Sequence, residues 1–257
     1  MRVGNKMDWR CRRFLSLVGA VVFFWIFPPL NAGAEDELNL NQVKEINRLI
    51  HDYLMSHPQV IVESVQKLRE QEKVTQREQG ASNLATFRDQ LENDPLTPVA
   101  GNPNGDVTIT EFFDYRCGYC KSTLSVVLQL LAEDSGVRLV LKEFPILSAE
   151  STIAARAALA AGIQGKYFKF HNALMGARGS LGKDEIMDIA AKSGLDTSRL
   201  ALDMETPHIQ AQVDANHELA ASLGIRGTPT FVIGNQILPG AIDVDTLRQI
   251  IQMMRAG

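Results

Sequence analysis

Hydrophobic positions predict a helical segment over residues 40–92. Apolar side chains such as Val43, Ile46 and Ile50 recur at the three- and four-residue spacing of a helix face. His57-Pro58 interrupts the pattern, because proline disfavours helix in the residue before it and readily begins a new helix. The apolar stripe is thin and its middle is polar. It therefore has to pack against the main domain or against copies of itself, unless it is a solvated arm.

A run rich in proline and glycine follows over residues 95–105 and predicts a linker. Eleven residues at polyproline extension reach about 34 Å. These patterns divide the chain into a helical arm (35–94), a linker (95–105) and a main domain (106–257). The arm and the main domain are expected to move separately.

The main domain opens with a βαβ pattern. Residues 107–113 are rich in β-branched and aromatic side chains and predict a strand. Helical periodicity follows over 117–132, and residues 137–144 predict a second strand. A hairpin over Gly234-Asn235 and a helix after Asp243 are expected near the end of the chain.

Between these strands lie residues 145–228, which show no strand pattern. Helices are expected over 151–161 and 183–193, ending at glycines, and Thr206-Pro207 begins another that ends near Gly224. A single crossover helix needs far fewer residues. The fold predicted is therefore α/β, with a helical subdomain inserted at about 146–224 and a helical arm in front.

The first 34 residues resemble a secretory signal peptide. Arginines precede an apolar run from Phe14 to Phe27, and Ala32-Gly33-Ala34 fits a cleavage site. A retained membrane anchor is the alternative, but fourteen helical residues span only about 21 Å of a core about 30 Å thick. Cleavage after Ala34 would place the protein in the periplasm.

Cleavage would also remove Cys11, so that Cys117 and Cys120 remain as the two cysteines. The leader holds five Lys/Arg and one Asp, which leaves 21 basic and 29 acidic residues. This net negative charge argues against nucleic acid as a partner.

The Cys117–Cys120 pair allows three interpretations. Zinc needs four ligands, and neither a second such pair nor closely spaced histidines accompany it. A structural disulfide closing so short a loop would constrain the unfolded chain little. Redox chemistry is favoured, because the pair lies where a strand ends and a helix begins. We expect no metal and no cofactor besides the Cys117–Cys120 disulfide itself.

The expected position at the helix start assigns a role to each sulfur. Free N–H groups and the helix dipole favour an anion there, so Cys117 is predicted to be the attacking thiolate. Cys120, one turn further into the helix, is predicted to resolve the mixed disulfide. Gly118 and Tyr119, between them, are expected to tune the redox potential.

Residues 111–120, the inserted helices and residues 227–231 together resemble the DsbA-like branch of the thioredoxin fold. The resemblance implies a cis Pro229 facing the active-site sulfur, with the backbone of Thr228 free to pair with a bound peptide; an ordinary turn is the alternative. It also matches Glu111 to a buried acid that transfers protons at the resolving cysteine, although Glu111 could instead be a solvent-facing strand residue. A weak expectation pairs Lys142 with Glu111.

The arm resembles the N-terminal extension of ScsC-like proteins, which mediates oligomerisation in some members. We therefore expect a homo-oligomer formed through residues 40–92. The implied function is disulfide isomerisation or reduction in exported, cysteine-containing proteins, with a membrane redox partner. Gly118-Tyr119 and Thr228 resemble the isomerase pattern. A monomeric disulfide oxidase and a non-enzymatic chaperone or copper-binding protein are the alternatives.

Overall fold

The computed structural model describes residues 38–179 and 181–256 and divides the chain into two units, 1–62 and 63–257. The expected signal peptide, residues 1–34, lies outside the described part.

The first unit contains α1 (Leu40–Ser56). Asn39 caps its start: the Asn39 side chain accepts hydrogen bonds from the backbone N–H groups of Asn41 and Gln42, and the Gln42 side chain accepts one from the Asn39 N–H. α1 has no buried residue, and its apolar stripe is open to solvent, with Tyr53 55% exposed. α2 (Gln59–Glu92) begins directly after Pro58, so the predicted break between two helices is confirmed.

α2 continues into the second unit and becomes part of its core. Leu84 and Leu91 are each 1% exposed and belong to one apolar cluster with Phe112 and Val232. The end of the predicted arm, residues 35–94, therefore belongs to the main domain, because these two leucines cover one face of its sheet.

The expected linker also needs correction, because its centre is a strand. β1 (Val99–Gly101) pairs antiparallel with β3 (Val137–Glu143). The Pro98 carbonyl accepts a 3.0 Å hydrogen bond from the Leu141 N–H, and the Asn102 N–H donates one of 2.9 Å to the Val137 carbonyl. Proline and glycine are tolerated at a sheet edge, so this composition is compatible with an edge strand as well as with a loop.

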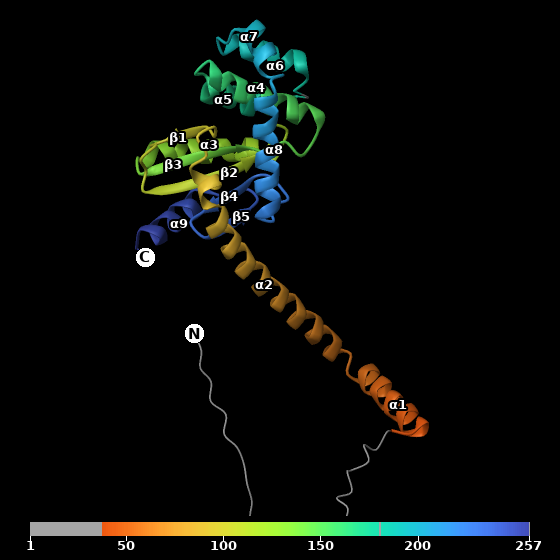
Figure 1. The fold of residues 1–257 in the computed structure, drawn as a ribbon. Coiled ribbons are helices and arrows are strands. Elements are labelled where there is room, and N and C mark those ends of the chain that lie inside the picture. The colour runs from red at the N-terminus through yellow and green to blue at the C-terminus, as the bar shows by residue number, and fades with distance from the viewer. Residues whose placement is uncertain (1–37, 180, 257) are drawn as a thin grey trace, which may run out of the picture. The chain divides into compact units, whose positions relative to one another are not determined.

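The sheet has five strands in the order β1-β3-β2-β4-β5 (Figure 1). β2 (Val107–Phe113) lies parallel to β3, and α3 (Gly118–Glu133) connects them, which confirms the predicted βαβ unit. β4 (Thr230–Ile233) pairs antiparallel with β2 and forms the predicted hairpin with β5 (Gln236–Pro239). Gly234, in the hairpin turn, has a φ of 57°, a value that glycine adopts easily.

Alternation along the strands separates two apolar clusters. Ile109 and Phe113 of β2 belong to the larger cluster, together with residues of α3 and α9 (Val244–Ala256). Phe112, the residue before Phe113, points to the opposite face and belongs to the second cluster with Leu84 and Leu91 of α2. Each side of the sheet is therefore covered by helices.

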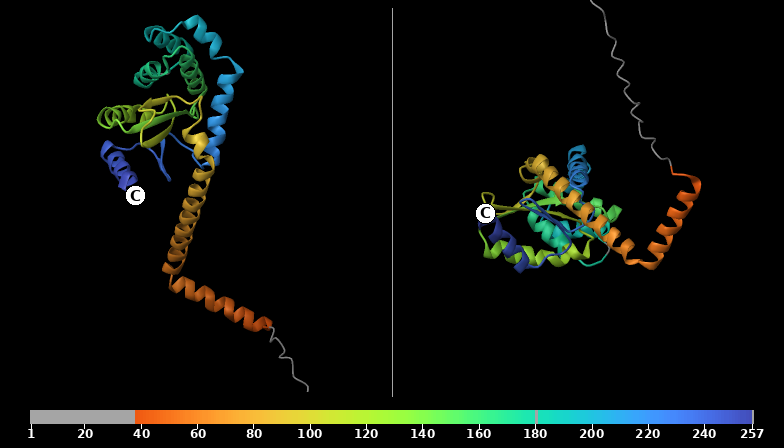
Figure 2. Two further views of the ribbon diagram at one scale, coloured as in Figure 1. Left: turned by 60° about the vertical axis from the view of Figure 1, so that its left-hand side comes forward. Right: turned by 90° about the horizontal axis from the view of Figure 1, so that it is seen from below.

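The predicted helical insertion is confirmed, and its described residues form five helices. These are α4 (Ala149–Ile163), α5 (Tyr167–Gly176), α6 (Lys183–Lys192), α7 (Thr197–Asp203) and α8 (Pro207–Ser222). Figures 1 and 2 show α4 to α7 gathered beyond one end of the sheet, with α8 returning along it. Gly194 and Gly224 adopt the positive φ expected of helix-ending glycines, whereas α4 runs through Gly162 to Ile163. Among the described residues, no helix is long and apolar enough to cross a membrane.

Lys142 provides a test of how firmly β1 and the residues before it belong to the domain. Lys142 is 1% exposed, and its ammonium donates to the Gln90 carbonyl at 2.9 Å, to Thr97 at 2.7 Å and to Asp94 at 3.2 Å. We expect Lys142→Ala to lower the free energy of unfolding by about 3 kcal/mol, because buried polar groups lose their partner. Lys192→Ala, on the exposed end of α6, is the control and should change the value by less than about 0.5 kcal/mol. If denaturant titration shows equal effects for the two variants, residues 95–105 are an independent linker after all.

Candidate active site

Cys117 is the residue that caps the start of α3. Its backbone is extended, and its sulfur accepts a 3.4 Å hydrogen bond from the Cys120 N–H. Cys117 is 6% exposed, whereas a side-chain carbon placed on Gly118 would meet nothing within 4 Å, so the space beside Gly118 is open. Tyr119 is 70% exposed. The residues between the two cysteines therefore lie at the surface, and Cys117 lies at the helix start.

The loop before β4 lies against this sulfur. The Thr228–Pro229 peptide bond is cis, as the resemblance implies. The Cys117 thiol donates a 3.2 Å hydrogen bond to the Thr228 carbonyl. This brings together two segments that are 111 residues apart in sequence, because β4 pairs with β2, the strand that leads to Cys117. The Thr228 carbonyl thus accepts this hydrogen bond while Cys117 carries its proton.

Cys120 lies deeper and has a different environment. Both cysteines are free thiols, and Cys120 is 1% exposed. Burial raises the pKa of the Cys120 thiol far above its ordinary value, and the hydrogen bond to Cys117 and the charges of Cys117 and Glu111 raise it further. Cys120 therefore holds its proton until another group removes it.

Glu111 is a buried acid that points to the same side of the sheet as Ile109 and Phe113, the side covered by α3. It is 6% exposed, and burial raises the pKa of its carboxyl to about 8. A solvent-facing position for Glu111 is therefore excluded. Its carboxyl is neutral at pH 7 and gains or loses a proton near the working pH of an acid–base catalyst.

The expected pairing of Lys142 with Glu111 is wrong. Glu111 is in register with Leu141, and Lys142 is in register with Phe112. Neighbouring residues of a strand point to opposite faces, so Lys142 points to the α2 side, where it contacts Asp94. The two side chains are separated by the sheet.

A buried polar network next to the site was missed by sequence reasoning. The Glu143 carboxyl accepts hydrogen bonds from the hydroxyls of Tyr115 (2.8 Å) and Tyr167 (2.7 Å), and the Tyr115 hydroxyl lies 3.0 Å from Nδ1 of His171. Burial raises the pKa of Glu143 well above its ordinary value, and burial lowers the pKa of His171 to about 3. His171 is thus neutral at pH 7, and burial favours the protonated form of Glu143. Glu143 belongs to a predicted strand and Tyr115 follows one, and nothing in either pattern indicated a contact with α5.

Asp114 also went unnoticed, although it joins two loops at the site. Its carboxylate accepts a 2.7 Å hydrogen bond from the Arg116 N–H, and two more from the N–H groups of Ile146 (2.9 Å) and Leu147 (3.0 Å). Asp114 is 1% exposed. It therefore fixes the turn before Cys117 against the loop that follows β3. An aspartate between strand and helix resembles any turn residue, so only the folded chain reveals this role.

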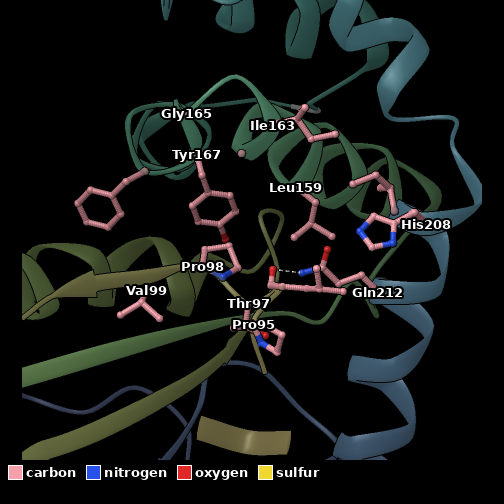
Figure 3. A pocket seen from close by; sticks show the side chains of 14 residues that line it. Pro95, Thr97, Pro98, Val99, Leu159, Ile163, Gly165, Tyr167, His208 and Gln212 are labelled. Carbon is pink, nitrogen blue, oxygen red and sulfur yellow. Dashed lines mark hydrogen bonds between the residues drawn. The ribbon is translucent and has the colours of Figure 1, made fainter. Parts of the chain in front are cut away.

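A cavity of about 510 Å³ lies between residues 95–99 and helices α4, α5 and α8. Figure 3 shows Tyr167 reaching from α5 toward Pro98, with Leu159 and His208 on other walls. Tyr167 thus links this cavity to the Glu143 network. Within the described part of the chain, no group of three or more His, Cys, Asp or Glu side chains is arranged to hold a metal ion.

The sheet, the cysteine pair at a helix start, the facing cis-proline loop and the inserted helices define a thioredoxin-fold protein of the DsbA-like class. Residues 108–252 match the family of DSBA-like thioredoxin domains, and the chain belongs to this family. Residues 42–73 match the N-terminal domain of the copper resistance protein ScsC.

Solved structures agree with this assignment. A thioredoxin-like oxidoreductase from Silicibacter pomeroyi is 46% identical, with 66% of this chain and 98% of that chain covered and a TM-score of 0.65. A linker-deletion and N6K mutant of Proteus mirabilis ScsC is 27% identical, with 87% and 99% covered and a TM-score of 0.66. The thiol-disulfide exchange protein alpha-DsbA2 from Wolbachia pipientis is 29% identical, with 70% and 98% covered and a TM-score of 0.65.

Curated relatives include much longer proteins. The Na(+)/H(+) antiporter NhaA of Herminiimonas arsenicoxydans is 27% identical over 160 residues, which make up 62% of this chain. The match covers 26% of the antiporter, so the chain spans about a quarter of the length of the curated relatives it matches.

Proposed function

We propose that this protein is a thiol–disulfide oxidoreductase that acts on cysteine-containing proteins through Cys117 and Cys120. The observation that carries the proposal is the 3.2 Å contact between the Cys117 sulfur, at the start of α3, and the carbonyl of Thr228 before the cis Pro229. One sulfur is thereby placed both at the positive end of a helix and beside a backbone that can hold a peptide. The dithiol itself is the redox group, and no further cofactor is required.

The chemistry takes two exchange steps. The Cys117 thiolate attacks a client disulfide, a mixed disulfide forms, and the client's other sulfur leaves and takes up a proton. Cys117 no longer carries a hydrogen, so the Thr228 carbonyl becomes free to accept a hydrogen bond from the client backbone. Cys120 then loses its proton and attacks the Cys117 sulfur, which forms the Cys117–Cys120 disulfide and releases the client thiol. Two electrons pass from the protein to the client.

Glu111 is proposed to accept the Cys120 proton in the second step. The Cys120 thiol has a raised pKa and needs a base, and the charge of Glu111 contributes to that raised pKa. The Glu111 carboxyl, with its pKa near 8, can take up and release a proton near that pH. Gly118 and Tyr119, which lie open to solvent between the sulfurs, are proposed to tune the redox potential.

Isomerisation or reduction of exported proteins is the role that we propose within this class, with a membrane protein as redox partner. A structural neighbour, 27% identical, is a periplasmic thioredoxin-like protein from Salmonella enterica serovar Typhimurium, which supports a periplasmic location. In isomerisation, a client thiol attacks the mixed disulfide in place of Cys120, and no net oxidation occurs.

The exposed apolar stripe of α1 supports a homo-oligomer. Leu40, Leu49 and Ile50 are each more than half exposed, and this region matches the ScsC N-terminal domain. Several copies would present their Cys117 sulfurs to one client, which favours isomerisation. Sedimentation of the chain without residues 1–34 should show a multiple of the 223-residue mass; a single-chain species would favour the monomeric oxidase.

Refolding of scrambled-disulfide ribonuclease tests the enzymatic proposal. We expect the wild type to restore ribonuclease activity and Cys117→Ser to leave it near the uncatalysed rate, because the attacking sulfur is absent. Equal recovery with both proteins would point to a chaperone. Equilibration against glutathione gives the reduction potential, and a strongly oxidising value would favour the oxidase.

A further inference from the structure

A hollow of about 590 Å³ lies next to the cis-proline loop, outside the residues that hold the two sulfurs. Its apolar walls come from the end of α8 and from β5, as Leu223, Ile225, Ile237 and Pro239. Gly227 and Thr230, which flank Thr228-Pro229 in the chain, line it as well. The hollow therefore begins at the backbone that is proposed to hold a client peptide.

Arg226 is the charged residue that lines this hollow. It is exposed, and among residues 38–179 and 181–256 its side chain makes neither an ion pair nor a hydrogen bond. Arg116, the residue before Cys117, differs in this respect, because its guanidinium donates a 2.8 Å hydrogen bond to Glu150. The charge of Arg226 thus has no partner in the described part of the chain.

The covalent geometry places the backbone of Arg226 close to the loop that contacts the reacting sulfur. Two residues span at most about 7 Å, so Arg226 lies within that distance, measured between Cα atoms, of Thr228. The Thr228 carbonyl in turn is 3.2 Å from the Cys117 sulfur. A side-chain carbon placed on Gly227 would meet nothing within 4 Å, so the space beside Gly227 is open.

We propose that Arg226 and this hollow select client segments with an acidic residue two positions from the reacting cysteine, flanked by apolar side chains. The inference rests on the proposed exchange function, because the client cysteine has to be bonded to Cys117. A client paired along residues 226–228 places a residue two positions from its cysteine opposite Arg226. The free guanidinium is complementary to a carboxylate there, and the apolar walls accept its neighbours.

Reduction of matched disulfide peptides by the reduced protein tests this proposal. Each peptide carries Asp, Asn or Lys two positions before or two positions after the cysteine and is otherwise identical. At low ionic strength we expect the wild type to reduce the better-placed Asp peptide about fivefold faster than its Lys counterpart, and the ratio should fall as salt screens the charges. The position that responds gives the direction in which the client lies.

Arg226→Glu should reverse the preference, whereas Lys192→Glu, an equal change of charge on α6, should leave it as in the wild type. The Asn peptides report the exchange chemistry alone and should react equally with all three proteins. If the Asn peptides are not reduced, the proposed function itself fails. If they are reduced but neither Asp position is preferred, or the preference survives in Arg226→Glu, the assignment of Arg226 is overturned while the function stands.

Discussion

Cys120→Ser is expected to accumulate a covalent complex with client proteins, joined through the Cys117 sulfur. The variant keeps the attacking sulfur at the start of α3 and lacks the buried thiol that resolves the mixed disulfide. Non-reducing electrophoresis of the protein mixed with an excess of a disulfide-containing client should show the adduct, and a reductant should remove it.

Cys117→Ser provides the opposite result in the same experiment. Its remaining thiol at Cys120 is 1% exposed and has a raised pKa, so it is both inaccessible and protonated. We expect no adduct and a loss of exchange rate on the order of a thousandfold or more, as for removal of other catalytic nucleophiles. An adduct with Cys117→Ser but not with Cys120→Ser would reverse the roles of the two sulfurs.

Glu111→Gln is expected to stabilise the protein at alkaline pH. The folded state raises the pKa of this carboxyl from 4.5 to about 8, so folding favours the protonated acid. Its contribution to stability is complete below pH 4.5 and is lost as the pH rises toward 8, by about 1.4 kcal/mol per unit. Glutamine resembles the neutral acid in shape and does not ionise. The variant should therefore match the wild type near pH 4 and exceed it by ~4 kcal/mol at pH 8.

Denaturant titrations of both proteins between pH 4 and 9 measure this difference. Glu143 has a raised pKa too, but it is present in both proteins and cancels in the comparison. Exchange rates of the same pair test the proposed catalytic role, because the resolving step should slow in the variant. If the free energies of unfolding of the two proteins change in parallel with pH, Glu111 does not have the raised pKa.

Local pattern was sufficient for most of the secondary structure. β2 was predicted over 107–113 and observed over the same residues, because a strand buried on both faces is rich in β-branched and aromatic side chains. The boundary at His57-Pro58 and the glycines after α6 and α8 followed from backbone restrictions that act on single residues. The Cys117–Cys120 pair was also found from spacing alone, since both cysteines belong to one helical turn.

Segments 95–105 and 84–91 show where local pattern was insufficient. Proline and glycine limit a backbone to loops or edge strands, and only β3, 40 residues later in sequence, provides the partner that makes residues 99–101 a strand. Leu84 and Leu91 have the spacing of a helix face, and this spacing is the same whether the helix is solvated or packed. Their burial depends on Phe112 and Val232, which come from other elements.

The sequence by itself predicted the cysteine pair at a helix start, the helical insertion and, through the family resemblance, the cis Pro229, because each depends on a short segment of the chain. The tertiary structure decided which charges meet. Lys142 faces Asp94 rather than Glu111, and Glu143 joins Tyr115 and Tyr167, because strand register and helix packing bring distant side chains to one face of the sheet. Arg226 lies beside an open hollow for the same reason: β5, the end of α8 and the cis-proline loop converge there only in the folded chain.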